Sequence, residues 1–488
     1  MAEQRAPRNM RKYLELLRET GELIEVKEEV DWHLEAAAIT ALGMRSAVDL
    51  HHPLEGKTYW FPKIKGYPKG YGLMTSAFAG TYERPWRHLA MAQGLDPDID
   101  LMTWMFEQAN RLQNPIKPIL VDTGPCKEEK HFGKDVNIFE FPLPYIHQGD
   151  GGRYGGTLTN FVLKHPEMDW MDVANYRWMA HTRNRLGMDL EPYQTGGMIY
   201  YVYETRGQSC PFAISIGGPP MLAYAACLPL PVGWNEYDYC GGLMQEPLEL
   251  VHCETNDLLV PAEAEVVIEG EIRPYERWDE GPFGEMIGYM QTPRRPRPVL
   301  HIHAITHRKD MVIWPVAIEG FRFATETFPI WYSAVISSFP GIFAQAGLPG
   351  AMTAIPKGIM ANFHFLAESY KDAGVIDAVI EQGGRMGVAT TSYMFLDSDL
   401  GIDVSTEELW EEIITRTRPD RVTNTMPKSH SSFYKAWLTP EEQLGGSPML
   451  RWDATTHDGD RPRARLKPET LWSQAVLERV EELRARIV

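Results

Sequence analysis

The segment Ala264-Glu-Val-Val-Ile-Glu-Gly-Glu-Ile272 alternates between apolar and acidic side chains over most of its length. In an extended chain, one face carries the apolar side chains Val266, Ile268 and Ile272. The other face carries the acids Glu265, Glu269 and Glu271. Val267 is the exception. A period of two is typical of a β-strand with one face in a core. The segment therefore predicts a strand in a layered β-structure.

The sequence around this strand keeps the same character from about residue 115 to residue 307. Short apolar runs, broken by Gly and Pro, occur at 119–121, 157–163 and 299–305. Many short strands with turn residues between them predict a barrel or a sandwich. A doubly wound sheet is less favoured, because no regular crossover helices separate the strands.

The region before the β-rich segment mixes helix and strand patterns. Residues 9–21 have the apolar spacing of an amphipathic helix that ends at Gly21. Residues 23–26 predict a strand, and residues 32–44 predict a second helix. Together these elements predict a small α/β unit over residues 1–115.

The region after the β-rich segment again mixes the two patterns. A strand is predicted at 311–316 and helices at 330–339 and 359–371. The tail, 468–488, is a strongly amphipathic helix that either packs on its own domain or docks on a partner subunit. We therefore divide the chain into an N-terminal α/β unit, a central β domain, a C-terminal α/β domain and a terminal helix, at 1–115, 116–310, 311–467 and 468–488.

Length and composition narrow the class of protein. A chain of 488 residues is too long for one ordinary core, so two or three domains are expected. The net charge of −18 makes nucleic acid an unlikely partner, because phosphate would be repelled. The chain has no signal-like apolar segment at its N-terminus and no apolar stretch long enough for a membrane span. Its 5 cysteines form no C-x-x-C pair, which favours a cytoplasmic protein without disulfides or a thiolate zinc site.

The motif with the most chemical content is Glu280-Gly-Pro-Phe-Gly-Glu285. Two carboxylates flank a Gly-Pro turn, so the backbone of the turn sets their relative position. Burial raises the pKa of a carboxyl group, as proton donation near neutral pH requires. The alternative is a surface turn with two solvated glutamates.

A second candidate segment contains Tyr176-Arg177, which follows Trp170-Met-Asp172. A guanidinium binds a carboxylate through two parallel hydrogen bonds, which suits the capture of an acid. The alternative is an arginine in a surface ion pair. Between this segment and the Gly-Pro turn, residues 248–262 read as a strand, a loop and a strand.

Three runs in order resemble the UbiD family of reversible decarboxylases: Glu249-Leu-Val-His-Cys-Glu-Thr-Asn-Asp-Leu-Leu-Val-Pro-Ala262, Glu265-Val-Val-Ile-Glu-Gly270 and Glu280-Gly-Pro-Phe-Gly-Glu-Met-Ile-Gly-Tyr289. The resemblance covers nearly the whole chain and is weakest after about residue 320. It implies an α+β multidomain fold, in which a split β-barrel of the flavin-reductase type lies between an N-terminal α/β unit and a C-terminal α/β domain.

The resemblance also implies an activity. Members of the family are carboxy-lyases that use prenylated FMN to remove CO2 from aromatic, heteroaromatic or α,β-unsaturated acids. Arg177 and Glu280 match the arginine and the first glutamate of a Glu–Arg–Glu network beside the flavin. Glu285 matches the glutamate that protonates the intermediate. The cofactor supplies the electron sink, and the protein supplies orientation and the proton.

A divalent metal, most often Mn²⁺, is implied beside the cofactor phosphate. Glu236 matches the family's glutamate ligand, whereas Asp172 stands where the family has Asn. The histidine ligand falls at Gln194 or at Thr195, and Gln194 would replace it through its carbonyl oxygen. Hard oxygen ligands suit Mn²⁺. These departures affect the identity and affinity of the metal.

Further contacts are implied by the same resemblance. The residues expected near the cofactor are Asp172, Asn175, Tyr176, Arg177, Tyr193, Gln194, Glu236 and Arg385. Arg385 would supply positive charge to the phosphate, or it is an ordinary loop arginine. The backbone carbonyls at Ala225, Ala226 and Leu228 match a K⁺ site of some members.

Several questions stay open from the sequence. His301 and His303 alternate with apolar residues, which favours a solvated strand face over a metal site, and His364, His430 and residues 321–328 are further candidates for the pocket. The family implies a homodimer or homohexamer and a separate prenylated-flavin synthase. The alternatives to a decarboxylase are a flavin-dependent oxidoreductase and a non-catalytic flavin-binding or assembly protein. The sequence does not name the acid.

Overall fold

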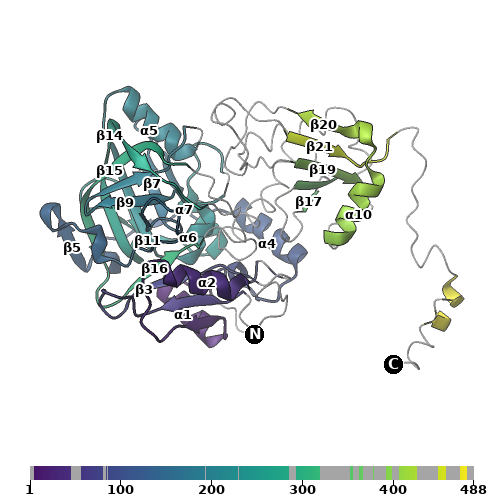
Figure 1. Ribbon diagram of the computed structural model, residues 1–488, viewed down its shortest axis with the longest axis horizontal. Helices are drawn as coiled ribbons and strands as arrows, with labels where there is room; N and C mark the ends of the chain where they lie inside the picture. Colours follow the sequence, from purple (N-terminus) through teal and green to yellow (C-terminus); the bar gives the residue numbers. More distant parts are fainter. Residues whose placement is uncertain are drawn as a thin grey trace.

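The structure is a computed structural model of the chain. It describes residues 5–45, 56–80, 84, 86–192, 194–228, 230–284, 293–318, 352–354, 362–366, 377, 392–397, 406–425, 449–457, 473–476 and 478–480. A central curled sheet lies above a smaller N-terminal sheet, and a third sheet lies to one side (Figure 1).

The N-terminal unit is built on a four-stranded sheet in the order β1 (Leu23–Glu25), β2 (Thr58–Phe61), β3 (Tyr71–Thr75) and β16 (Val312–Val316). Strand β16 pairs in parallel with β3. The strand expected at 311–316 is therefore present, but it completes the N-terminal sheet after the chain leaves the central one. The helices of this unit are α1 (Met10–Glu19), α2 (Glu35–Arg45), α3 (Arg87–Ala92) and α4 (Leu101–Gln113).

Helix α1 shows how the sequence pattern sets the packing. The Asn9 side chain accepts a hydrogen bond from the backbone N–H of Lys12 at 2.9 Å, which caps the first turn. The predicted apolar face is buried, and its members are Met10, Tyr13, Leu14 and Leu17. The helix ends before Gly21, whose φ of +73° lies in the left-handed region that glycine adopts readily. The predicted N-terminal helix is confirmed.

The central sheet has nine strands and curls into an open half-barrel (Figure 1). Its order is β6-β9-β10-β15-β14-β11-β7-β8, and β5 pairs with β15. The bounds are β5 Glu129–Phe132, β6 Arg153–Tyr154, β7 Asn160–Lys164, β8 Met171–Ala174, β9 Trp178–Thr182, β10 Arg185–Met188, β11 Cys210–Gly217, β14 Ala264–Glu280 and β15 Arg295–His307. The predicted α+β fold around a split barrel is confirmed.

The alternating segment that predicted a strand forms the first part of β14. Its apolar face is buried as expected, but Glu265 and Glu269 on the other face are also fully buried. Glu265 accepts hydrogen bonds from Arg11 at 2.9 Å and Arg308 at 3.2 Å. Glu269 accepts hydrogen bonds from backbone N–H groups at the start of the 254–257 turn. Each buried acid therefore has partners, as buried charge requires.

Shorter elements complete the central region. Helices α5 (Thr195–Thr205), α6 (Pro220–Ala225) and α7 (Glu236–Met244) lie around the half-barrel, and a three-stranded sheet has the order β13 (Leu259–Pro261), β12 (Glu249–His252) and β4 (Ile119–Leu120). Single 3-10 turns are η2 (Pro125–Lys127), η3 (Gly133–Asp135) and η4 (Ile138–Glu140). The strand, loop and strand predicted over 248–262 are confirmed.

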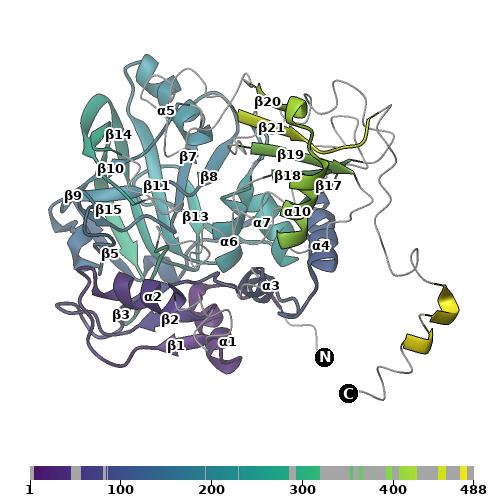
Figure 2. The ribbon, with the colours of Figure 1, turned by 45° about the vertical axis from the view of Figure 1, so that its right-hand side comes forward.

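The C-terminal sheet has the order β17 (Met352–Ala354), β18 (Asn362–Leu366), β19 (Ser392–Asp397), β21 (Met449–Asp453) and β20 (Val422–Thr425). Helix α10 (Thr406–Arg416) and the turn η7 (Pro419–Arg421) accompany it. In both ribbon views this region lies next to α4 (Figures 1 and 2).

The helix predicted over 359–371 is wrong where the structure describes it, because residues 362–366 form β18. Phe363 and Phe365 alternate along this strand, and aromatic residues favour strands. Partners on both sides, β17 and β19, satisfy its backbone, and a single-sequence pattern does not reveal such pairing. The helix predicted at 330–339 lies outside the described residues.

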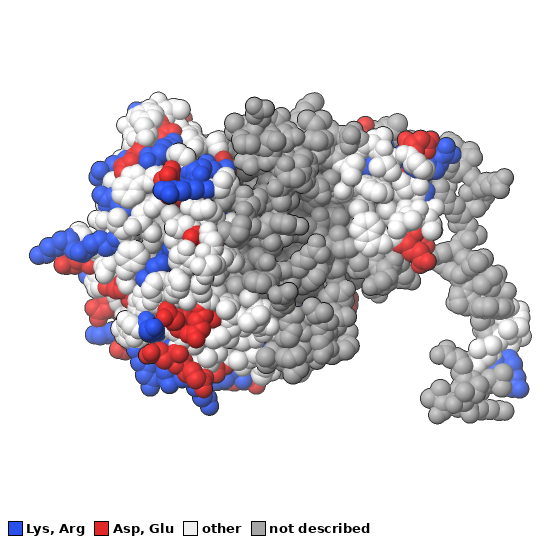
Figure 3. Space-filling view, viewed as in Figure 1, with Lys and Arg blue, Asp and Glu red and all other residues white. Residues whose placement is uncertain are grey.

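The tail is helical at 474–476 and 478–480, within the predicted 468–488 helix. Val476 and Val480 are 45% and 46% exposed there. On the face drawn in Figure 3, acidic and basic side chains of the described residues are interspersed. Among the described residues, no helix is long and apolar enough to cross a membrane.

Candidate active site

Arg177 and Glu280 meet although they lie at the ends of different strands of the central sheet. Arg177 directly precedes β9, and Glu280 is the last residue of β14. Arg177 Nε lies 3.2 Å from Glu280 Oε1, and the Glu280 side chain is fully buried. Tyr154 donates a second hydrogen bond to the same oxygen at 2.7 Å. Burial, and then the negative charge of Glu280, raise the pKa of Tyr154, so the phenol stays protonated and donates.

The Gly-Pro turn after Glu280 is held from the opposite side by residues 150 and 151. Gly281 has a φ of +88°, a conformation that glycine adopts without strain. Gly151 N–H donates to the Pro282 carbonyl at 2.8 Å, and Gly284 N–H donates to Asp150 Oδ1 at 3.1 Å. Phe283 places its ring centroid 5.2 Å from the Arg177 guanidinium carbon. Contacts within the protein therefore hold the turn in place. Its second acid, Glu285, lies outside the described residues.

Asp189 is a member of this cluster that the sequence did not single out. Its Oδ2 lies 2.7 Å from Arg177 Nη2, while Oδ1 lies 2.7 Å from Arg297 Nε and 3.1 Å from Arg295 Nη2. Burial opposes ionisation of this carboxyl, but the positive charges of Arg177, Arg297 and Arg295 hold the pKa of Asp189 below its ordinary value. Asp189 is therefore a buried anion shared by three guanidinium groups.

Glu191 extends the same network. Its Oε1 lies 2.8 Å from Arg295 and also pairs with Arg297. The two acids and the two arginines continue the antiparallel register of β10 and β15, in which Gly187 lies opposite Val299. The sequence signal is a pair of acids two residues apart facing a pair of arginines two residues apart, and it becomes visible only once the strands are paired.

A second pair of buried carboxylates is formed by Asp172 on β8 and Glu236, the first residue of α7. Asp172 is fully buried and Glu236 is 6% exposed. Burial raises the pKa of Asp172 to about 6. Burial, and then the negative charge of Asp172, raise the pKa of Glu236 well above its ordinary value. Glu236 Oε2 accepts a hydrogen bond from Val173 N–H at 2.9 Å.

This pair has the properties of a cation site. Asp172 Oδ1 is buried and accepts no hydrogen bond from the described residues. Two carboxylates in a dry environment repel each other when both are ionised, and a divalent cation removes that repulsion while supplying the missing partner. The oxygen-only donor set suits Mn²⁺ or Mg²⁺. Asp172 and Glu236 therefore fit the predicted metal.

Tyr176 joins this pair to the start of α5. Its hydroxyl lies 3.3 Å from Asp172 Oδ2 and 3.2 Å from Thr195 Oγ1, and it accepts a hydrogen bond from Gly196 N–H at 2.8 Å. Gln194 Oε1 instead accepts a hydrogen bond from Glu191 N–H at 2.9 Å. Of the two alternatives for the third metal ligand, Thr195 is thus the one linked to Asp172 through the Tyr176 hydroxyl.

The other predicted contacts are placed as follows. Asn175 Nδ2 donates to the Ala223 carbonyl at 2.8 Å, and its Oδ1 is buried without a hydrogen bond from the described residues. Ala225 and Ala226 lie at the end of α6, and the Ala225 carbonyl accepts a hydrogen bond from Leu228 N–H at 3.0 Å. Tyr193, Arg385, His430 and residues 321–328 lie outside the described residues.

The two strand histidines differ from each other. The side chain of His303 is 43% exposed, as a solvated strand face predicts. The prediction is wrong for His301, which is 3% exposed and lies 2.7 Å from Glu276 Oε2. The bulge in β14 between Ile272 and Arg277 carries Glu276, which gives the buried imidazole a partner. His364 lies on β18.

Comparison with known proteins identifies the family of this chain. The model of the 3-octaprenyl-4-hydroxybenzoate carboxy-lyase Rift-related domain matches residues 119–321, and that of the N-terminal domain of the same carboxy-lyase matches residues 14–105. The chain is 30% identical over 455 residues to pyrrole-2-carboxylic acid decarboxylase of Pseudomonas aeruginosa, covering 91% of this chain and 90% of that one. It is 30% identical over 351 residues to ferulic acid decarboxylase 1 of Saccharomyces cerevisiae, covering 70% and 67%.

Solved structures of decarboxylases also resemble this chain in fold. The vanillic acid decarboxylase of Sedimentibacter hydroxybenzoicus in its closed form superposes with a TM-score of 0.82 at 26% identity, over 99% of both chains. A UbiD-class enzyme from Pelotomaculum thermopropionicum in complex with FMN superposes with a TM-score of 0.75 at 25% identity, over 96% of this chain and 99% of that one. Because the likeness in sequence and in fold extends over almost the whole chain, this protein belongs to the UbiD family of carboxy-lyases.

Proposed function

We propose that the protein catalyses the non-oxidative, reversible decarboxylation of an aromatic, heteroaromatic or α,β-unsaturated carboxylic acid, with prenylated FMN and a divalent metal as cofactors. The observation that supports this most directly is the buried contact of Arg177 with Glu280 beside the Gly-Pro turn. A guanidinium held by buried acids offers a fixed site for a carboxylate. The relatives named above act on pyrrole-2-carboxylic and ferulic acids, which belong to the same chemical class.

Arg177 is proposed to bind and orient the carboxylate that leaves as CO2. Its Nε contacts Glu280 and its Nη2 contacts Asp189, so the guanidinium plane is held at two points. Overall, the carbon–carboxylate bond breaks, the electron pair stays on the substrate carbon, and a proton replaces CO2 there. Prenylated FMN, when bound, supplies the conjugated acceptor that stabilises this electron pair.

The replacement proton is assigned to Glu285, with Glu280 as the neighbouring acid on the same turn. The donor must hold its proton until the C–CO2 bond has broken and must then deliver it to carbon over a short distance. Residues 150 and 151 fix the turn through two hydrogen bonds, which supports a constant direction of delivery.

The metal is assigned to Asp172 and Glu236, with Thr195 or Gln194 as a further ligand. In this assignment Asp172 and Glu236 would hold a divalent cation, Mn²⁺ by the family, which would offset the negative charge of the cofactor phosphate. Asn175, Tyr176, Tyr193 and Arg385 would complete the cofactor site, and the backbone carbonyls of Ala225, Ala226 and Leu228 would hold K⁺. We also propose that the domains of the chain end at residues 115, 310 and 467, and that the protein is a cytoplasmic homodimer or homohexamer. A separate synthase would supply the prenylated flavin.

The direct test is turnover by protein co-expressed with a prenylated-flavin synthase. CO2 release is measured across a panel of aromatic, heteroaromatic and acrylic acids, beside the flavin absorbance of each preparation. Release from at least one acid supports the proposal. Pyridine-nucleotide oxidation without CO2 would indicate an oxidoreductase, and bound flavin without any turnover would indicate a non-catalytic binding protein.

The assignment of the proton donor has its own test. Glu285→Gln should abolish product formation while the flavin stays bound. Glu271→Gln is a suitable control, because Glu271 is partly exposed and pairs with Arg273 on the outer part of β14. Full activity of Glu285→Gln would remove the proposed role.

A further inference from the structure

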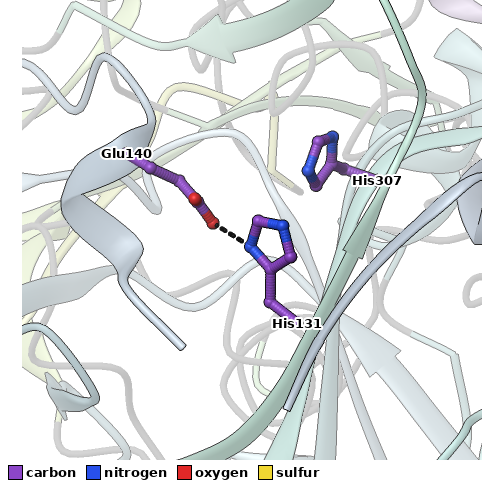
Figure 4. A group of neighbouring side chains, drawn as sticks. All are labelled: His131, Glu140 and His307. Atoms are coloured by element: carbon purple, nitrogen blue, oxygen red, sulfur yellow. Dashed lines mark hydrogen bonds and ion pairs between the residues drawn. The ribbon is translucent and has the colours of Figure 1, made fainter. Parts of the chain in front are cut away.

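A cluster of metal-ligating side chains lies outside the proposed active site, on the edge of the central sheet where β5 joins β15. It consists of His131, Glu140 and His307, and one ligand atom from each residue lies within 4.8 Å of the others. Figure 4 shows the Glu140 carboxylate and the two imidazoles turned toward one another. We infer that these three residues form a site for a divalent metal ion of the zinc class, separate from the carboxylate pair at Asp172 and Glu236.

The strand register brings the two histidines together. In the antiparallel pair of β5 and β15, His131 lies opposite Ile305 and His307 lies opposite Glu129. His131 and His307 are therefore diagonal neighbours on one face of the ladder, a separation that long side chains span. Glu140 comes from η4, and its Oε1 lies 2.8 Å from His131 Nδ1. The three ligands thus come from three separate pieces of backbone.

The hydrogen bonds of His307 prepare it to act as a ligand. His307 Nδ1 lies 2.8 Å from the Arg308 carbonyl, which only accepts, so Nδ1 carries the proton of the neutral ring. Nε2 then holds the lone pair that a metal requires. A ligand imidazole whose other nitrogen donates to a backbone carbonyl is the usual arrangement around protein-bound metals.

The surroundings distinguish this cluster from a surface ion pair. His307 is 4% exposed, and the rings of Phe141 and Tyr71 lie 5.3 Å and 6.2 Å from it. The side chains of His131 and Glu140 are 30% and 27% exposed, which leaves one side open for an ion to enter. An apolar wall behind one ligand and an open front are features of a site that binds its ion from solvent.

The local charge also favours a cation. The Glu140 carboxylate, held 2.8 Å from His131 Nδ1, supplies negative charge at the position that an ion would occupy. Glu129 lies opposite His307 in the ladder, but its carboxylate pairs with Lys309 Nζ at 3.5 Å.

Two imidazoles and one carboxylate select the class of metal. This donor set is common for Zn²⁺, with water as the fourth ligand, and it also accepts Co²⁺ and Ni²⁺. Bonds of about 2.0–2.1 Å require ligand atoms about 3.4 Å apart, so the cluster must contract on binding. The partly exposed side chains of His131 and Glu140 can make this movement without disturbing the buried imidazole.

The expected effect of the ion is to tie η4 and β5 to β15. The chain that follows η4 leads to Tyr154, which donates to Glu280 in the proposed active site. Binding of the ion to the folded chain alone stabilises it by mass action.

The experiment uses the full-length protein, stripped of metal with a chelator. Binding of Zn²⁺ and Co²⁺ is measured by equilibrium dialysis with elemental analysis, and the visible absorption of bound Co²⁺ reports its ligand geometry. His131→Gln and Glu140→Gln should each remove one equivalent of Zn²⁺, or weaken it at least about tenfold, together with the tetrahedral Co²⁺ absorption. Asp172→Asn should leave this equivalent in place, which separates the inferred site from the one in the proposed active site.

Matched controls test specificity. His303→Gln removes an exposed histidine from the same strand, and Glu129→Gln removes one charge from the same edge without removing a ligand; both should bind Zn²⁺ like the unmodified protein. Circular dichroism checks that each variant is folded. Three results would overturn the inference. The first is undiminished Zn²⁺ binding by folded His131→Gln and Glu140→Gln, and the second is an equal loss in Glu129→Gln. The third is the absence of the tetrahedral Co²⁺ absorption in the unmodified protein.

Discussion

The Asp189 carboxylate lies 2.7 Å from Nη2 of Arg177, while Glu280 meets the same guanidinium at Nε. One acid that directly follows β10 and one at the end of β14 thus hold two edges of one planar cation. Phe283 lies against its face. Such an arginine has little freedom to rotate, so its remaining donor geometry is set before any substrate arrives.

Asp189→Asn should weaken both the fold and the reaction. The substitution removes the charge shared by Arg177, Arg295 and Arg297 and leaves buried guanidinium groups short of an anion. We expect a loss of about 3 kcal/mol in the free energy of unfolding, the lower end for breaking a buried pair. We also expect at least a tenfold lower kcat/KM for the carboxylic acid, measured beside urea denaturation. Asp279→Asn is the control, since Asp279 is 45% exposed and pairs with the exposed Arg294.

The role of Asp189 is separable from simple stability. If it positions Arg177, the variant should lose kcat/KM at temperatures where circular dichroism shows it fully folded. Unchanged kcat/KM in the folded variant would mean that Asp189 stabilises the fold but does not position Arg177 for the reaction.

Removal of metal should make stability depend on pH through Asp172. Its folded-state pKa of about 6 lies above its ordinary value of 3.8, so the folded protein binds more protons than the unfolded chain between these values. Stability of the metal-free protein therefore falls as pH rises from about 4 through 6. The raised pKa of Glu236 extends the fall to higher pH. Saturating Mn²⁺ should abolish this slope, because the cation favours both ionised carboxylates.

Thermal midpoints measured from pH 4.5 to 8, with chelator and with Mn²⁺, test this expectation. Asp172→Asn in chelator should be at least as stable as the unmodified protein at pH 8 and should gain nothing from Mn²⁺. Equal stabilisation of both proteins by Mn²⁺ would mean that the ion binds elsewhere.

Local pattern was sufficient for the elements whose burial is periodic. The spacing of Met10, Tyr13, Leu14 and Leu17 predicted α1 because a helix buries one face, and the alternation at 264–272 predicted β14 for the corresponding reason. Residues 362–366 were missed because their strand is specified by neighbours on both sides, not by their own sequence.

The candidate active site was likewise only partly predictable from local sequence. Arg177 and Glu280 are 103 residues apart, and nothing local in either segment reveals their contact; the family resemblance brought them together. Asp189 was missed because an acid at the end of a strand is ordinarily solvated, and its burial depends on arginines more than 100 residues later, at the start of β15. Departures from the family at Asp172 and Thr195 were visible in the sequence, but the fold was needed to show that the Tyr176 hydroxyl lies between the two side chains.

Tyr154→Phe should reduce activity without unfolding the protein. The substitution keeps the buried ring and removes the 2.7 Å hydrogen bond to Glu280 Oε1. A hydrogen bond to a charged group contributes about 1.5–3 kcal/mol, so we expect a loss of this size in stability. Because Glu280 then retains Arg177 as its partner on that oxygen, kcat should fall several-fold and not to zero. Tyr203→Phe, which removes a 3.2 Å hydrogen bond to a backbone carbonyl on β7, is the control. Equal effects in both variants would argue against a specific role.

Gly196→Ala tests whether the start of α5 supports the metal site. Within a helix, Ala is ordinarily more stable than Gly by about 1 kcal/mol. Here a Cβ would lie 2.6 Å from Cε2 of Tyr176, whose buried ring cannot retreat because its hydroxyl contacts both Asp172 and Thr195. Overpacking of this kind costs about 1–3 kcal/mol, so the clash should outweigh the gain in helix propensity. We expect lower stability and weaker Mn²⁺ binding, measured by calorimetric titration. Thr205→Ala, at the exposed end of the same helix, should leave Mn²⁺ affinity unchanged. A Gly196→Ala protein with full Mn²⁺ affinity would show that Tyr176 does not position Asp172.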